Sequence, residues 1–269
     1  MRVGLISDVH ANLPALRTVL DRLADERLDR LLCLGDVVGY GGDPEACLAL
    51  VRERADTVVM GNHDAAAAHA WARASFHSWA REAIEAHAAW LDAEALAFLA
   101  GLPGAVHAGN GGQRGLFLTH GTPGETYPFT YLTTAGEAGP ALASFQERFG
   151  AVGHTHVPAL FTIASGSPRV ELGDLEMELA RAAGAEAAAD VGRDAVLDLV
   201  LGPGTRAILN PGSVGQPRDG DPRASCMVLD VGLGAVRWLR LPYDVRAAQA
   251  VIRRRGLPEI LAARLALGR

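Results

Sequence analysis

Short polar motifs that directly follow short apolar runs constrain this chain more than any other feature. Apolar runs at 3–6, 31–34 and 57–60 predict strands, and helical patterns at 12–26 and 43–54 lie between them. Asn12 and Asp43 stand where N-caps belong, each followed by a proline in the first helical turn. Strands that alternate with helices predict right-handed βαβ units and a largely parallel sheet.

The motifs at the ends of these strands share one chemical character. They read Ser7-Asp8-Val9-His10, Gly35-Asp36 and Gly61-Asn62-His63-Asp64, and two later strands end in Thr119-His120-Gly121 and Gly153-His154-Thr155-His156. In open α/β sheets the carboxyl ends of the strands form the ligand-binding edge, so we expect these motifs to meet there. On extended backbone, residues i and i+2 face the same side, which would direct both members of each D-x-H or H-x-H pair to one site.

The side chains in these motifs are those of metal ligands. The candidate ligands are Asp8, His10, Asp36, Asn62, His120, His154 and His156. Carboxylate, imidazole and amide groups without a thiolate suit Mn²⁺, Fe or Zn²⁺ better than a structural zinc site. Seven ligands exceed the needs of one tetrahedral ion and fit two ions that share a carboxylate.

The rest of the chain is predicted to be rich in short strands. We expect two or three helices in the alanine-rich stretch 65–100, and helices at 245–254 and 258–267. Strands are predicted at 105–108, 115–119, 151–152, 160–163, 196–200, 207–209, 226–231 and 236–241. The segment 173–192 fits a helix or a loose insertion equally well. No repeat and no convincing linker divides the chain.

Composition excludes several classes of function. All 25 basic residues are arginine, which excludes Schiff-base and P-loop lysine chemistry, and the net charge of −6 argues against a nucleic-acid partner. The arginines at 253–255 fit the solvated end of a helix. Three cysteines without a CxxC pair, the lack of a signal-like start and the lack of a long apolar run predict a cytoplasmic protein without membrane contact.

In their order, the motifs resemble those of the calcineurin-like metallophosphoesterases: D-x-H, G-D, G-N-H-[DE], H and G-H-x-H. The resemblance covers about residues 1–156, and the run NPGSVGQPRDGDPR at 210–223 is similar to the small prokaryotic phosphodiesterase branch. It implies an α/β (α+β) chain folded as a four-layer αββα sandwich. We expect one domain over 1–269, with a cap-like helical insertion at 65–105 and a further insertion at 165–205.

The resemblance also implies roles for individual residues. One ion would be held by Asp8, His10, Asp36 and His156, and the other by Asp36, Asn62, His120 and His154. The ions could be Mn, Fe, Zn or Ni. His63 would face the substrate phosphate and, as imidazolium, assist the leaving group. Asp64 would orient the His63 ring or cap a helix before Ala65, and Asn12, Tyr40 and Arg218 are weaker candidates for substrate contact. The remaining histidines, His69, His77, His87 and His107, are expected to be caps or surface residues.

The implied reaction is hydrolysis of a small phosphodiester by a metal-bridging hydroxide. Two alternatives remain open: a non-catalytic binding scaffold of the same fold, and a phosphomonoesterase or nucleotide phosphatase. The second strand continues as Gly-Asp-Val-Val-Gly-Tyr-Gly at 35–41, not as G-D-x-x-D-R-G. This departure argues against the protein Ser/Thr phosphatases and the symmetrical dinucleoside tetraphosphatases. The charge and length argue against a recombination-type DNA nuclease.

Overall fold

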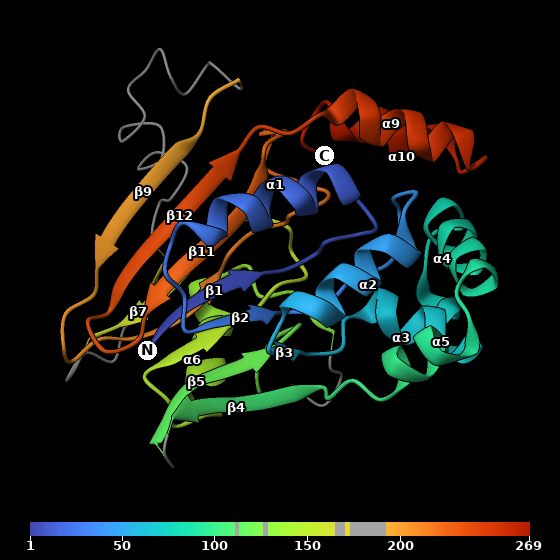
Figure 1. Ribbon diagram of the computed structural model, residues 1–269. Coiled ribbons are helices and arrows are strands. Elements are labelled where there is room, and N and C mark those ends of the chain that lie inside the picture. The colour runs from blue at the N-terminus through green and yellow to red at the C-terminus, as the bar shows by residue number, and fades with distance from the viewer. Residues whose placement is uncertain (111–112, 126–128, 165–169, 173–191) are drawn as a thin grey trace.

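Two mixed β-sheets form the centre of the molecule in the computed structural model, which describes residues 1–110, 113–125, 129–164, 170–172 and 192–269 (Figure 1). Sheet A has the order β3 (Thr57–Val58), β2 (Arg30–Cys33), β1 (Arg2–Ile6), β11 (Ala224–Asp230), β12 (Ala235–Leu241) and β9 (Ala195–Val200). Sheet B has the order β4 (Ala105–Asn110), β5 (Gln113–Thr119), β6 (Phe149–Ala151), β10 (Arg206–Asn210), β7 (Ala159–Ile163) and β8 (Val170–Leu172).

The prediction of a largely parallel sheet is wrong. In sheet A only β1, β2 and β3 run parallel, and β11, β12 and β9 pair with their neighbours antiparallel. In sheet B, β5, β6 and β10 run parallel, and the flanking strands are antiparallel. The βαβ pattern belongs to the first sixty residues, whereas β11 and β12 are joined by a turn too short for a parallel crossover.

The two sheets face each other across an apolar interior. Inward-facing side chains of both sheets are fully or almost fully buried there, and they include Val3, Leu5, Leu32, Leu116, Leu118, Phe149, Leu209, Met227 and Trp238. Trp238 is the largest of these side chains, and its indole N–H donates to the Asn210 carbonyl at 3.0 Å. Burial of this apolar surface is the main force that holds the sheets together.

Helices cover the outer faces of both sheets and complete the predicted αββα sandwich (Figure 1). On sheet A, α1 (Leu13–Ala24) and α2 (Pro44–Arg54) begin after Asn12 and Asp43, as predicted. Of these two residues, Asn12 caps its helix through its side chain, which accepts from the Ala15 N–H, and Asp43 makes no such bond. On sheet B, α6 (Ala135–Ala143) packs Ala138 and Leu142 against the sheet. Sequence analysis missed α6, whose two glycines and one proline obscure the helical pattern.

The remaining helices gather at one end of the sandwich (Figure 1). The chain after β3 forms α3 (Asn62–Ala68), the 3₁₀ helix η1 (Ala70–Ser75), α4 (Ser78–Trp90) and α5 (Ala93–Ala100). Helix α4 packs with α9 (Val245–Arg254) and α10 (Glu259–Leu265), both predicted. The expected insertion at 165–205 lies largely outside the described residues, apart from β8 and the stretch from 192 that contains β9. Among the described residues, every helix is too short or too polar to cross a membrane.

Candidate metal centre

The predicted ligands meet where parallel strands of both sheets end. Asp8 follows β1, Asp36 follows β2, and the loops after β5 and β6 carry His120 and His154. Backbone hydrogen bonds align these loops within each sheet, from the Asp8 N–H to the Gly35 carbonyl (3.0 Å) and from the Gly153 N–H to the His120 carbonyl (2.9 Å). The His154 N–H donates to Asp8 Oδ2 at 3.2 Å and so joins the two sheets.

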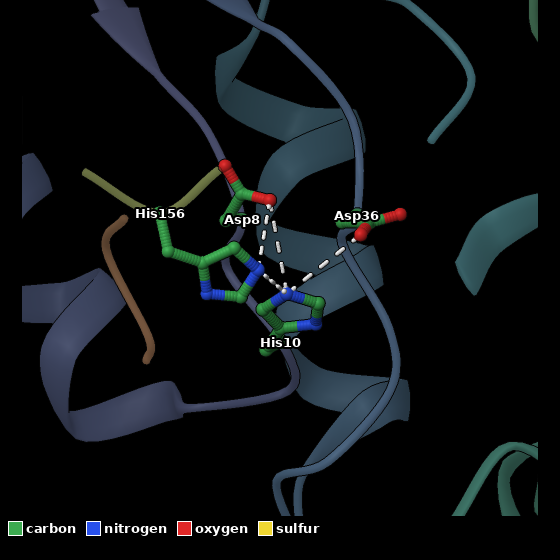
Figure 2. A group of neighbouring side chains, drawn as sticks. All are labelled: Asp8, His10, Asp36 and His156. Atoms are coloured by element: carbon green, nitrogen blue, oxygen red, sulfur yellow. Dashed lines mark hydrogen bonds and ion pairs between the residues drawn. The ribbon is translucent and has the colours of Figure 1, made fainter. Parts of the chain in front are cut away.

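A first cluster consists of Asp8, His10, Asp36 and His156, all buried, and Figure 2 shows the four side chains converging. Their ligand atoms lie within 4.8 Å of one another. Asp8 Oδ1 lies 3.3 Å from His156 Nε2 and 3.8 Å from His10 Nε2. Asp36 Oδ2 lies 3.7 Å from His10 Nε2.

A second cluster consists of Asp36, His120 and His154, which are also buried. Asp36 Oδ2 lies 3.3 Å from His120 Nε2, and Asn62 Oδ1 lies 3.2 Å from the same nitrogen. The structure thus brings all seven candidate ligands together. Asp36 belongs to both clusters, as expected for a shared carboxylate.

The backbone at these residues differs from the expected extended form. Asp8, His10, Asp36, His154 and His156 all have positive φ, from 48° to 68°. For residues other than glycine, this left-handed conformation is sparsely populated, costs about 1–3 kcal/mol each, and concentrates at functional sites. The pairs therefore converge through tight turns beyond the strands. The two histidines of the H-x-H motif also belong to different clusters, His156 to the first and His154 to the second.

The hydrogen bonds of the imidazoles fix which ring nitrogens face the clusters. Nδ1 of His10, His120 and His156 donates to the carbonyls of Val38, Leu34 and Gln216, at 3.0, 2.7 and 2.6 Å, respectively. Burial lowers the pKa of His10 and of His156 well below the usual range, so both rings are neutral and each Nε2 then carries a lone pair.

The clusters are consequently crowded with acceptors. His10 Nε2 and His156 Nε2 face each other at 3.1 Å. Asp8 Oδ1 and His154 Nδ1 are buried without a hydrogen-bond partner among the described residues. Lone pairs and carboxylate oxygens at such separations repel one another unless a cation lies between them. This donor set fits divalent metal ions.

The pKa values show the same demand for positive charge. Burial lowers the pKa of a histidine, yet the charges of Asp36 and Asp8 and the hydrogen bonds to Asp36 and Leu34 together outweigh burial and raise the pKa of His120 to about 9. Burial alone would raise the pKa of Asp36, but His120 and His63 hold it well below its usual range. Burial and the neighbouring Asp36 raise the pKa of Asp8 to about 6.

Asp64 organises the loop that carries Asp36. Its carboxylate accepts backbone N–H bonds from Asp36 (2.8 Å), Val37 (2.9 Å), Val38 (3.3 Å) and Gly61 (3.1 Å). The bond from Gly61 is the half of a capping box in which the side chain at the third helical position accepts from the N-cap N–H, so Asp64 caps α3 from that position. Asp64 does not orient His63, because backbone donors occupy both of its oxygens.

His63 is held by ring packing. Its ring centroid lies 4.4 Å from that of Tyr40 and 4.8 Å from that of Phe76. Its Nδ1 is buried and has no hydrogen-bond partner in the described part of the chain. Burial lowers the pKa of His63 to about 4, so the imidazole is neutral near pH 7 when no phosphate anion is bound beside it.

A cavity of about 410 Å³ opens above the clusters. Asp36, Asn62, His63, His154 and His156 contribute to its lining. Tyr40 and Arg218, both proposed from the sequence as substrate contacts, line it too, and Arg218 donates to the Tyr40 hydroxyl at 3.2 Å. The cavity therefore joins candidate ligands, His63 and one guanidinium group in a single site.

Two residues take structural roles that sequence analysis did not assign. Asn12 is absent from this cavity lining, because its amide donates to the Gly215 carbonyl (2.8 Å) and the Tyr243 hydroxyl (3.1 Å). His87, expected to be a cap or surface residue, is fully buried on α4. Its Nδ1 accepts from the Gly39 N–H and its Nε2–H donates to the Gly41 carbonyl, both at 2.9 Å. The helical spacing of buried Ala80, Ala83 and Ile84 with His87 could have revealed this position.

The helical segment supplies cavity residues that the sequence motifs did not reveal. Trp71, Phe76 and Ala80 line one part, and Phe129 and Tyr131 come from the chain between β5 and α6. None of these five residues belongs to a metal-ligand motif. The sequence signal of the four aromatic ones is that they interrupt alanine-rich or threonine-rich stretches, and Ala80 has no such signal.

Comparisons with known proteins show relatives that match this chain over almost its whole length. A crystal structure of a metallophosphoesterase from Sphaerobacter thermophilus is 36% identical with a TM-score of 0.77, covering 100% of this chain and 99% of that chain. The uncharacterized protein MJ0912 of Methanocaldococcus jannaschii is 30% identical over 270 residues, which are 99% of this chain and 98% of that protein. The hypothetical protein PH1004 of Pyrococcus horikoshii OT3 is 17% identical with a TM-score of 0.74, covering 100% of this chain and 98% of that chain, and shares the fold.

A match between the sequence and a family model identifies the family. Residues 1–233 match the calcineurin-like phosphoesterase superfamily domain, a range that includes every predicted ligand and Arg218. The chain belongs to the calcineurin-like phosphoesterase superfamily.

Proposed function

We propose that this chain is a phosphodiesterase for small substrates that uses two divalent metal ions. The observation that carries the proposal is the buried Asp36 carboxylate, shared by two clusters of lone-pair donors at the base of a cavity. One ion would be held by Asp8, His10, Asp36 and His156, and the other by Asp36, Asn62, His120 and His154. When bound, two such ions supply water of lowered pKa and neutralise charge on phosphate oxygens.

The chain's own groups orient the ligands and receive the substrate. Asp36 Oδ1 accepts from the His63 N–H at 2.8 Å and Asp8 Oδ2 accepts from the His154 N–H, which leaves the second oxygen of each carboxylate facing the clusters. Such fixed partners position ligands and raise metal affinity. The burial of these groups keeps the polar centre rigid and partly dry.

His63 and Arg218 are suited to the phosphate group. His63 lines the cavity with its ring centroid 4.8 Å from that of His10, and a bound phosphate anion would raise the pKa of this imidazole and favour its proton. His63 then holds a proton for the leaving oxygen. Arg218 can pair with a phosphate oxygen through its guanidinium group.

Charge favours a diester over a monoester. Arg218 is the only arginine among the described residues that line the cavity. Beside the two proposed ions, the lining therefore offers one permanent cation to the phosphate oxygens; a phosphodiester carries one negative charge, whereas a monoester near neutral pH carries almost two. The two substituents of a diester also suit the volume above the clusters.

Turnover of two aryl phosphates tests the proposal. Protein stripped with a chelator and reloaded with Mn²⁺ is expected to hydrolyse bis(p-nitrophenyl) phosphate faster than p-nitrophenyl phosphate. His63→Gln should lower kcat by about 10²–10⁴-fold and retain Mn²⁺. His107→Gln is the matched control, because His107 lies on β4 and pairs with Glu147.

Each contrary result has a distinct meaning. Undiminished turnover in His63→Gln would remove the assigned role of His63. Faster turnover of the monoester would make the protein a phosphomonoesterase. Absence of turnover with Mn²⁺, Fe²⁺, Ni²⁺ and Zn²⁺ would return the chain to the class of binding scaffolds.

A further inference from the structure

The cavity above the clusters has an aromatic wall, which we define as Trp71, Phe76, Phe129 and Tyr131. These side chains come from two separate segments, the η1–α4 region and the chain between β5 and α6. None is a candidate metal ligand, and of the four only Phe76 packs on His63. The proposed chemistry therefore leaves most of this wall unexplained.

Two members of the wall are exposed to a degree that is unusual for large rings. Trp71 is 79% exposed and Tyr131 is 52% exposed, and both line the same cavity. Large apolar side chains exposed together at a hollow are typical of a binding site. The 3₁₀ helix that carries Trp71 has no buried residue, so core packing does not explain the tryptophan.

Tyr131 also lies directly beside the metal centre. Its ring stacks on the imidazole of His154, with centroids 4.3 Å apart and planes 12° from parallel. A group held against Tyr131 is therefore adjacent to the phosphate position. Arg218 and Tyr40, which line the same cavity, add a cation and a hydroxyl close to the rings.

From this arrangement, and on the basis of the proposed function, we infer that the substrate carries a flat aromatic ring, such as a nucleobase. The ring stacks against Trp71 and Tyr131 while the phosphate lies over the clusters. Exposed aromatic side chains form stacking platforms for bases without needing sequence-specific hydrogen bonds. The volume of about 410 Å³ suits one small molecule.

Three phosphate-bearing probes separate the ring from the phosphate. AMP, ribose 5-phosphate and hexyl phosphate share a phosphate monoester, and only AMP carries a flat aromatic ring. Equilibrium binding to the Mn²⁺-loaded protein is measured by titration calorimetry, so the result does not depend on turnover. AMP is expected to bind about tenfold or more tightly than either of the other probes, the magnitude typical of one stacked base.

Variants of the wall then test which residues produce the preference for AMP. Trp71→Ala and Tyr131→Ala should each reduce the ratio of AMP to ribose 5-phosphate affinity by about five- to tenfold, whereas Trp71→Phe and Tyr131→Phe should keep most of it. Leu233→Ala is the matched control, because Leu233 is 72% exposed and lies outside the cavity lining.

The outcomes distinguish this inference from the proposed function. Equal binding of AMP and ribose 5-phosphate would overturn the aromatic subsite and leave the phosphoesterase reaction standing. Hexyl phosphate binding as tightly as AMP would show a merely apolar wall and would also overturn it. A preference that survives both alanine variants would overturn the assignment to Trp71 and Tyr131. Failure of all three probes to bind would overturn the inference, whereas the proposed function fails only if the Mn²⁺-loaded protein also does not hydrolyse bis(p-nitrophenyl) phosphate.

Discussion

Asp36 and Trp71 line the same cavity, but Asp36 is buried and Trp71 is exposed. Asp36 is completely buried and its backbone is in the left-handed region. One of its carboxylate oxygens accepts a hydrogen bond from the His63 N–H. Trp71 is exposed on a short 3₁₀ helix without a buried residue. The two clusters below the cavity, which we call its floor, are fixed by backbone and burial, whereas the aromatic wall comes from the η1–α4 region and the chain before α6.

This contrast separates the chemistry of the site from its selectivity. The floor uses the ends of strands from both sheets, so its geometry depends on the whole sandwich. The wall uses the helical segment and the chain before α6, which can change without disturbing the sheets. A change in the floor should affect all substrates equally, and a change in the wall should alter the ratio between them.

The largest expected effect comes from removing the shared carboxylate. Asp36→Asn should reduce kcat/KM by about a thousandfold or more for every substrate, because it removes the negative charge that faces both clusters. Initial rates with an aryl phosphodiester measure this loss, and Asp21→Asn on the exposed side of α1 is the control. A loss of kcat/KM confined to aromatic substrates would contradict the assignment of chemistry to the floor and of selectivity to the wall.

A smaller effect, on metal affinity, is expected from a change at Asp64, which binds the backbone of the loop that carries Asp36. Asp64→Asn removes part of the acceptor capacity that holds the backbone of Asp36, Val37 and Val38. Metal affinity should fall by about 10–100-fold, as measured by competition with a chelator, since partners of ligands tune affinity without replacing them. Asp92→Asn is the control, because Asp92 caps α5. Unchanged metal affinity in Asp64→Asn would show that the loop does not depend on Asp64.

The smallest effect is on the pH dependence of stability, and it comes from His87, which joins the helical segment to the loop after β2. His87 on α4 binds the loop that carries Tyr40, and burial lowers its pKa to about 3. In the unfolded chain its pKa is about 6.5, so below that pH the unfolded state takes up a proton that the folded state does not. The stabilising contribution is therefore complete above pH 6.5 and is lost as the pH falls towards 3.

Urea unfolding of the metal-free protein at pH 7, 6 and 5 measures this contribution. The unfolding free energy of His87→Gln should depend on pH less steeply than that of the wild type, by about 1.4 kcal/mol per pH unit at the acid end. Other histidines titrate in both proteins, so the difference isolates His87. Identical slopes would contradict the assigned neutral state of His87.

The floor could be predicted from the sequence because its ligands come in fixed spacings after apolar runs. Seven candidate ligands were identified by residue type and position, and the structure gathers all seven. The left-handed turns at Asp8 and His154 were not predictable, because Asp and His are enriched at positive φ but still adopt it at only a small fraction of their positions. The role of Asp64 depends on backbone N–H groups of a distant loop, which local sequence does not encode.

The wall and the outer layers were less predictable. Aromatic residues in an alanine-rich stretch indicate helices, but the cavity they line depends on how α4 packs against α9 and α10. The antiparallel half of sheet A was obscured for a similar reason, since short strands alone do not specify their partners. Helix α6 was missed because internal glycine and proline outweigh its capping box at Thr134.

Counting bound ions tests the central claim most directly. Titration of metal-free protein with Mn²⁺ should give two ions per chain for the wild type, and one for His120→Ala, which loses a ligand of the second cluster only. His107→Ala should still bind two. A wild-type count of one or none would contradict the two clusters as a paired metal centre.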